Sequence, residues 1–247
     1  MVKKYLRRKP LEYERKIEAG VFDAQTMGAL RKLMKLNIIG DLGGVIATGK
    51  EADVFTAFLK GKPRAVKIYR IETTGFKDIM QYVEGDPRFR LSGRKHEMVF
   101  EWAKKEFRNL ERAFHAGVKV PRPYKVLRNV LVMDFIGNDT EPAMPLNAVT
   151  RAQIKNPKKL SKILLGYLKK LYQKAGLVHA DFSEFNVLMK SMDEPYLIDF
   201  AQAVLKTQPN AEQFLERDVE NFVHYFEKFG IKFDRIKILA QIIGKKE

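Results

Sequence analysis

Residues 177–188 read LVHADFSEFNVL, and residues 196–201 read YLIDFA. Asp181 and Asn186 stand five positions apart on a short loop, and Asp199 closes the second of the two strands expected to follow. Because a β-hairpin brings the outer ends of its strands together, Asn186 and Asp199 should face one space. Their oxygen atoms are of the kind that Mg²⁺ prefers, together with substrate phosphates. Asp181 has no ligand role imposed on it, so it is free to accept a proton from a hydroxyl group.

The order of elements on either side of this stretch predicts the fold class. Strands are expected within residues 38–69 and at 124–127, 130–135, 187–189 and 196–198, and helices at 9–36, 97–116, 158–175, 211–229 and 232–243. Residues 72–96 mix Gly, Pro and charge without clear periodicity, which predicts a long, partly ordered insertion. Strands come first and helices dominate later, an order typical of an α+β, two-lobed fold. The Gly, Asn, Asp and Pro residues of 137–147 mark the expected lobe boundary.

Composition narrows the function classes. The 247 residues contain no cysteine, which excludes a disulfide framework, a thiolate nucleophile and a Cys-ligated zinc site. The apolar runs are too short to cross a bilayer, and the first residues have no apolar core of a signal peptide. We therefore expect a cytoplasmic protein with no membrane partner. The net charge of +16 indicates a polyanionic partner, a phosphorylated small molecule or a lysine-rich solvated surface.

Several motifs in order resemble those of one family. HxDxxxxN followed by a strand-end Asp-Phe resembles the catalytic loop and metal-binding motif of protein kinases. Together with ATGKEADVF, AVKIYR, WAKKEFRNLERA, VLVMDFIG and ERDVENF, it resembles the RIO family of atypical serine/threonine protein kinases, in the branch that lacks an N-terminal winged helix. The matches run from about residue 43 to 226, most of the chain.

The resemblance implies a protein-kinase-like fold without a long activation segment. Residues 1–36 would be a basic helical segment packed on the kinase domain, 37–136 the N-lobe with its flexible insertion at 72–96, and 137–247 the C-lobe. Only about 12 residues separate Asp199 from the next expected helix, which fits the missing activation segment.

The resemblance also implies a role for each site residue. Lys67 would contact the α- and β-phosphates of ATP, with Glu106 as its ion-pair partner. Asp181 would be the catalytic aspartate, while Asn186 and Asp199 would bind Mg²⁺, or Mn²⁺ in its place. Further contacts with the nucleotide are implied for the hinge residues Met133, Asp134 and Ile136, the turn Thr48, Gly49 and Lys50, and the loop residues Ser183 and Glu184.

Asp218 has support from the residue pattern as well. It falls on the apolar stripe of Leu215, Val219 and Phe222, and a buried carboxylate is costly unless it is hydrogen-bonded. The resemblance implies that it braces the backbone of the catalytic loop.

Residues 44–51 offer a competing motif, GVIATGKE, one residue away from a Walker A loop. Glu51 replaces the Ser or Thr hydroxyl that would coordinate Mg²⁺, and a strand is expected to follow where a P-loop needs a helix. A P-loop NTPase is therefore disfavoured.

The leading hypothesis is an ATP-dependent serine/threonine phosphotransferase that phosphorylates itself and acts in maturation of the small ribosomal subunit, a role the resemblance implies. Residues 151–175 carry one Arg and seven Lys without an acid, which suits contact with rRNA. Two alternatives remain: a small-molecule kinase of the aminoglycoside or choline type, and an RNA-binding assembly protein that uses nucleotide as a switch.

Overall fold

The structure, a computed structural model, describes residues 22–71, 76–89, 94–138 and 141–244. The chain divides into two compact units. Unit 1 comprises Met1–Ile79, Arg88–Arg108 and Arg122–Pro142, and unit 2 comprises Met80–Pro87, Asn109–Pro121 and Ala143–Glu247. The expected helix over 9–36 is described only in its last part, because residues 1–21 lie outside the described ranges.

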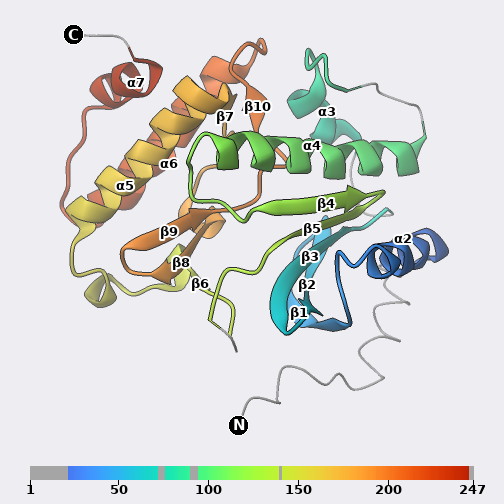
Figure 1. Ribbon diagram of the computed structural model, residues 1–247. Helices are drawn as coiled ribbons and strands as arrows, with labels where there is room; N and C mark the ends of the chain where they lie inside the picture. The colour runs from blue at the N-terminus through green and yellow to red at the C-terminus, as the bar shows by residue number, and fades with distance from the viewer. Residues whose placement is uncertain (1–21, 72–75, 90–93, 139–140, 245–247) are drawn as a thin grey trace. The chain divides into compact units, whose positions relative to one another are not determined.

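Unit 1 is built on a five-stranded antiparallel sheet in the order β1-β2-β3-β5-β4. The strands are β1 (Leu42–Thr48), β2 (Ala52–Leu59), β3 (Lys62–Tyr69), β4 (Pro123–Leu127) and β5 (Val130–Asp134). Helix α2 (Ala24–Lys35) begins after the N-cap Asp23, whose side chain accepts a hydrogen bond from the amide of Thr26 at 2.7 Å. Figure 1 shows α2 and the long helix α4 (Lys95–His115) beside this sheet.

The alternation of side chains along β3 assigns its residues to two faces. Val66 and Ile68 join a buried cluster with Leu30 and Leu33 of α2. Lys67, between them in sequence, therefore projects from the opposite face. One face of the sheet thus packs into an apolar core, and Lys67 lies on the other face.

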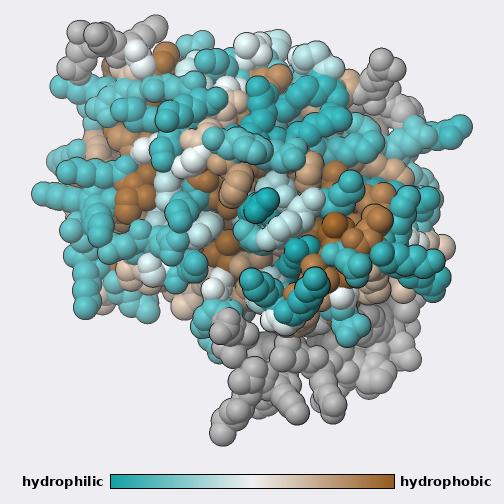
Figure 2. Space-filling view, viewed as in Figure 1, coloured by the Kyte–Doolittle hydropathy of each residue, from teal (hydrophilic) through white to brown (hydrophobic). Residues whose placement is uncertain are grey.

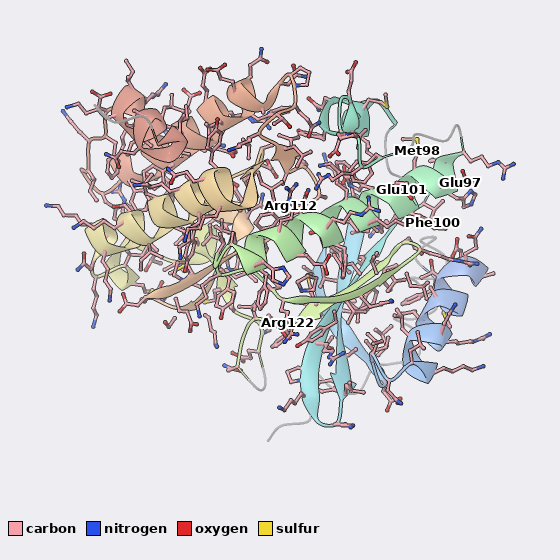
Figure 3. The ribbon with its side chains drawn as sticks, turned by 45° about the horizontal axis from the view of Figure 1, so that its top comes forward. Glu97, Met98, Phe100, Glu101, Arg112 and Arg122 are labelled. Atoms are coloured by element: carbon pink, nitrogen blue, oxygen red, sulfur yellow. The ribbon has the colours of Figure 1, made fainter. Side chains whose placement is uncertain are left out.

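The most deeply buried residues of helix α4 include polar as well as apolar side chains. Phe114, near the end of the helix, is 39% exposed. Lys105, Glu106 and Asn109 are instead at most 1% exposed. Figure 3 follows this helix from Glu97, Met98, Phe100 and Glu101 to Arg112. Buried polar groups need hydrogen-bond or ion-pair partners. Lys105, Glu106 and Asn109 therefore do more than fill the core.

Unit 2 is mainly helical. Its helices are α5 (Pro157–Lys170), continued by a π-helical turn (Leu171–Ala175), α6 (Ala211–Glu227) and α7 (Arg235–Ile243), with short 3₁₀ turns at Leu146–Ala148, Arg151–Gln153 and Glu184–Asn186. Its strands are β6 (Met144–Pro145), β7 (Leu177–Val178), β8 (Val187–Ser191), β9 (Glu194–Leu197) and β10 (Val204–Leu205). Sheet β6-β8-β9 and the pair β10-β7 lie among these helices (Figure 1). An antiparallel sheet in one unit and helices in the other confirm the α+β class.

The insertion contains more regular structure than expected. Residues 76–83 form helix α3 (Phe76–Val83) within the segment that was expected to be partly ordered. Ile79, Tyr82 and Val83 are buried. Within unit 2, the side-chain amide of Gln208 donates to the carbonyl of Glu84 at 2.9 Å. Gly, Pro and charged neighbours hid a short amphipathic helix.

No helix among the described residues is long and apolar enough to span a membrane. Figure 2 shows hydrophilic residues over most of the face it draws.

Candidate active site

In unit 1 the central pair of the site is Lys67 and Glu106. The Lys67 ammonium lies 3.0 Å from each carboxylate oxygen of Glu106 on α4. Lys67 is 8% exposed and Glu106 is 1% exposed. Removing one partner of such a pair would leave a buried charge uncompensated, so the two side chains are held together.

The β1–β2 turn holds Thr48, Gly49 and Lys50, all of them exposed. The amide of Gly49 donates to the carbonyl of Ala52 at 2.9 Å, and β2 follows directly. The carboxylate of Glu51 accepts a hydrogen bond from the indole of Trp102 at 3.4 Å. A strand after the turn, and a Glu that bonds to α4, exclude a P-loop geometry here.

Of the expected hinge residues, Met133 and Asp134 end strand β5 and Ile136 follows it. Met133 and Ile136 are 9% and 8% exposed. The amide of Asp134 donates to the carbonyl of Arg122 at 2.9 Å, and its carboxylate accepts from the Tyr124 hydroxyl and, at 3.3 Å, from the Arg122 amide. The backbone amide of Asp134 is therefore already bonded within the sheet.

In unit 2, Asp181 and Asn186 are bonded to each other. The side-chain amide of Asn186 donates to the Asp181 carboxylate and to the Asp181 carbonyl, both at 2.8 Å. The 3₁₀ turn Glu184–Asn186 makes this possible, because it folds Asn186 back toward Asp181. In this turn the backbone amide of Asn186 donates to the Ser183 carbonyl at 3.1 Å. The side-chain nitrogen of Asn186 thus donates twice to Asp181, and the side-chain oxygen of Asn186 takes no part in these two bonds.

Asp199 follows β9, whose pairing with β8 joins it to the same loop. The Ile198 amide donates to the Asn186 carbonyl at 3.0 Å. Burial, and then the negative charge of Asp199, raise the pKa of Asp181. The hairpin thus brings Asp181, Asn186 and Asp199 together, as the spacing predicted.

Two residues of this region have left-handed backbone conformations. Ala180 has a φ of 65° and Asp199 a φ of 62°. For residues other than glycine this region is sparsely populated, and such strain concentrates at functional sites where surrounding contacts enforce it.

Helix α6 supplies those contacts around Ala180. The carboxylate of Asp218 accepts the amides of Ala180 and Phe182, both at 2.9 Å. Asn221 donates to the Phe182 carbonyl at 2.9 Å, and Arg217 donates to the Ala180 carbonyl. Complete burial raises the pKa of Asp218 to about 7, although the two amides act in the opposite direction. The expected brace by Asp218 is confirmed.

His179 orders the loop from the inside. It is 1% exposed, and its Nε2 lies 3.2 Å from the Ile198 carbonyl. Burial lowers its pKa to about 4, so the ring is neutral at neutral pH. A neutral ring beside a carbonyl donates through Nε2. This bond joins His179, two positions before Asp181, to Ile198, the residue before Asp199.

The chain after Asp199 is held by Asn109. Its side-chain amide donates to the carbonyls of Phe200 at 3.0 Å and Ala203 at 2.8 Å. Asn109 is 0% exposed. This contact fixes the short segment that leads from Asp199 to α6.

Of the two loop residues expected at the nucleotide, Glu184 has another partner. Its carboxylate lies 2.9 Å from the ammonium of Lys228, at the end of α6. Burial alone would raise the pKa of Glu184, but the Lys228 bond and charge lower it. Glu184 therefore connects the loop to α6, while Ser183 contributes its carbonyl to the turn.

The donor set fits a magnesium ion bound with phosphate. Among the described residues no three His, Cys, Asp or Glu side chains gather as a metal site. Mg²⁺ needs no such cage, since it binds through one or two carboxylates together with water and substrate phosphate oxygens. The carboxylate of Asp199 and the amide oxygen of Asn186 are donors of the right chemistry.

Sequence reasoning missed four residues of this architecture: Tyr69, Asn109, Arg217 and Asn221. The signal for Asn109 was a polar residue three positions after Glu106, on the same helical stripe. Arg217 and Asn221 are four positions apart and flank Asp218, so one face of α6 carries all three.

Comparison with known proteins identifies the family to which this chain belongs. Residues 53–238 match the family model described as RIO domain. The chain belongs to the RIO family of protein kinases. It is 44% identical to the RIO-type serine/threonine-protein kinase Rio1 of Haloferax volcanii, over 93% of this chain and 78% of that protein. It is 39% identical to Rio1 of Methanocaldococcus jannaschii, over 92% and 77%.

Other members of the RIO family match over smaller parts of their length. The serine/threonine-protein kinase RIO1 of Homo sapiens is 38% identical, over 90% of this chain and 40% of that protein. Among solved structures, a Rio2 kinase–ADP/Mg²⁺–phosphoaspartate complex from Chaetomium thermophilum matches with a TM-score of 0.69 and 24% identity, over 96% of this chain and 76% of that one. The expected family, protein-kinase enzyme class and protein-kinase-like fold are confirmed.

Proposed function

We propose that this RIO-type kinase transfers the γ-phosphoryl group of ATP to a serine or threonine hydroxyl, with Mg²⁺ as cofactor. The observation that carries the proposal is the cluster of Asp181, Asn186 and Asp199 at one end of the β8–β9 hairpin. Support for the nucleotide comes from the related Rio2 kinase, whose complex contains ADP and Mg²⁺. Curated relatives with 38–44% identity are named serine/threonine-protein kinases.

Each residue has a defined task in this proposal. Asp181 accepts the proton of the attacking hydroxyl, and its raised pKa makes it a better base than an exposed carboxylate. Asn186 and Asp199 would hold the metal, which when bound neutralises charge on the phosphates. Lys67, oriented by Glu106, would bind the α- and β-phosphates. Mn²⁺ would use the same oxygen donors.

ATP labelled at its γ-phosphate tests the proposal directly. Wild-type protein should release labelled phosphate, label itself, or label an added protein, and Asp181→Asn should lower each of these rates by about 10²–10⁴-fold, the range for loss of a positioned base. Wild-type protein without ATP turnover, or Asp181→Asn with unchanged turnover, would contradict it. Transfer to small amine or aminoglycoside acceptors, with none to protein, would favour the alternative class of kinase.

The chemistry of any self-label can be separated. A phosphoester on serine or threonine survives hydroxylamine, whereas an acyl phosphate is cleaved by it. Since the related Rio2 complex contains a phosphoaspartate, both treatments are needed before the label is assigned. Stable label supports autophosphorylation. Thr73, Thr74 and Ser92, candidate acceptors in the insertion, lie outside the described residues.

We further propose that the basic face of α5 binds ribosomal RNA during maturation of the small subunit, in the cytoplasm. Lys155, Lys158, Lys159, Lys162 and Lys174 are exposed, while Leu160, Leu164 and Leu168 are buried. The helix and the residues beside it therefore present their charge to solvent. Binding through phosphates should weaken steeply as salt rises from about 50 to 200 mM, because counterions are released.

A matched pair of variants tests this surface. The double variant Lys158→Gln with Lys162→Gln should weaken RNA binding. It should also make the plot of log affinity against log salt concentration shallower, by the equivalent of about one to two phosphate contacts. Lys60→Gln with Lys62→Gln, at exposed positions of the β2–β3 turn, removes the same charge from unit 1. Equal effects of both pairs would indicate attraction to net charge rather than a site on α5.

A further inference from the structure

We propose that Tyr69 is a positioning residue for phosphoryl transfer, because its hydroxyl holds Glu106 in the ion pair with Lys67. The inference rests on the proposed kinase function and adds a residue that neither the motifs nor the comparisons assign. Tyr69 stands two positions after Lys67 on β3. Side chains two apart on a strand share a face, so the hydroxyl and the ammonium project toward the same helix.

Glu106 receives a bond from each of these groups. The Tyr69 hydroxyl donates to Oε2 of Glu106, while the Lys67 ammonium donates to Oε1 at 3.0 Å. The ammonium also lies 5.1 Å from the centre of the Tyr69 ring, within cation–π range. Tyr69 and Glu106 are each 1% exposed. Hydrogen bonds to a charged group at a site screened from water are among the strong ones.

The tyrosine is itself fixed in place. Its amide donates to the Asn129 carbonyl at 2.9 Å, and the Asn129 side chain donates back to the Tyr69 carbonyl at 2.8 Å. On the next residue, Arg70 forms an ion pair with the buried Asp53 at 2.9 Å. The end of β3 is thus anchored on one side by β2 and on the other by the turn before β5. A hydroxyl on a fixed strand restrains the carboxylate that it contacts.

This arrangement makes the ion pair complete within unit 1. Both Lys67 and Tyr69 belong to one strand, and Glu106 is bound to that strand through both oxygens. With the hydroxyl removed, Glu106 would keep its ion pair with Lys67 but lose the Tyr69 bond to Oε2, which helps to fix its orientation. Lys67 would then hold its phosphate contact less accurately, and misplacement of a positioning group lowers the rate of transfer steeply.

The test is a double-mutant cycle with Tyr69→Phe and Glu106→Ala, measuring kcat, the KM for ATP and the ATP dissociation constant. Tyr69→Phe keeps the ring and removes only the hydroxyl. It should lower kcat about 3- to 30-fold, since a bond to a charged group is lost. The ATP dissociation constant should change less than about threefold, because the Lys67 charge remains. In the Glu106→Ala background, where the Tyr69 hydroxyl has lost its acceptor at position 106, Tyr69→Phe should lower kcat by less than about twofold.

A matched control removes another tyrosine-to-glutamate bond. The Tyr196 hydroxyl donates to Glu194 at 3.1 Å on the β8–β9 hairpin, and Tyr196→Phe should leave kcat within about twofold of wild type. The melting temperature of each variant is measured by circular dichroism, and all assays are run well below it.

The outcomes are distinct. A wild-type kcat retained by Tyr69→Phe, or an equal loss with and without Glu106, would overturn the role of Tyr69 and leave the kinase function standing. A wild-type protein with no ATP turnover would overturn the kinase function itself. A loss confined to the Glu106-containing background supports the proposal.

Discussion

The side-chain amide of Asn186 donates to the carboxylate of Asp181 at 2.8 Å. This bond means that Asn186 orients the expected base as well as supplying an oxygen for a metal. A carboxylate at position 186 would be the stronger ligand for Mg²⁺, but it could not donate to Asp181. The two roles therefore make opposite demands on the side chain.

The variant Asn186→Asp separates them. Replacing the donor with a second negative charge should raise the pKa of Asp181 further above its ordinary value, since burial and Asp199 already raise it. A raised pKa keeps the base protonated to higher pH, so the acidic limb of the kcat profile should move upward. The measurement is kcat against pH for both proteins. An unshifted limb with a lower kcat would restrict Asn186 to metal binding.

Asp218→Asn tests the brace from α6. An amide can accept one backbone amide but turns its own donors toward the other, so the Phe182 or Ala180 amide loses its partner. Unfolding free energy should fall by about 1–3 kcal/mol, the cost of an unsatisfied buried donor, and kcat should fall with it. Urea unfolding and steady-state rates measure the two effects. Asp193→Asn, at an exposed residue paired with Lys159, is the control and should cost under about 1 kcal/mol.

His179 gives the fold a dependence on pH. Its pKa is lowered from 6.5 to about 4, so the unfolded chain binds the proton more readily, and stability is lost as pH falls through this window. Relative to pH 7.5, the contribution at about pH 5 should be lower by about 2 kcal/mol. Asp218 has a raised pKa, so it makes the fold more stable as pH falls over the same range. Its contribution is removed by comparing two proteins that both contain it.

The comparison is between wild type and His179→Gln. Glutamine can still donate to the Ile198 carbonyl but does not titrate. The difference in unfolding free energy between the two proteins should therefore shrink on acidification. A constant difference from about pH 7.5 to 5 would show that His179 is not the group responsible.

Glu184→Gln should leave nucleotide binding nearly unchanged. Because the Glu184 carboxylate is bonded to Lys228, its loss removes a link between the loop and α6 rather than a ligand for ATP. We expect the KM for ATP to change less than about threefold. Lys228→Gln should give the same small effect. A tenfold rise in KM for Glu184→Gln alone would restore the role that the resemblance implied.

The sequence was most informative where chemistry and local spacing coincide. The spacing of Asp181, Asn186 and Asp199 predicted their meeting because a hairpin imposes it. Asp218 was found for a similar reason, since a carboxylate on an apolar stripe must be bonded. Glu106 was one of several glutamates on its helix, and only the motif resemblance selected it.

The remainder depended on partners remote in sequence. Tyr69 looked like an ordinary strand aromatic, because nothing local shows that a helix carboxylate lies above it. Glu184 looked available for the nucleotide, because Lys228 stands 44 positions away. Helix α3 was missed since its eight residues lie among strong breakers of helical pattern.

The position of α2 has a practical consequence. The family match begins at Asp53, inside β2, so a chain shortened to the matched residues would lack both α2 and β1. The sheet would then expose Val66, Ile68, Val130 and Val132 to water, and β2 would become its edge strand in place of β1. Uncovered edges and apolar faces promote strand-to-strand association, so such a fragment should precipitate. Preparations for crystallography or ligand screening should therefore begin before Phe22.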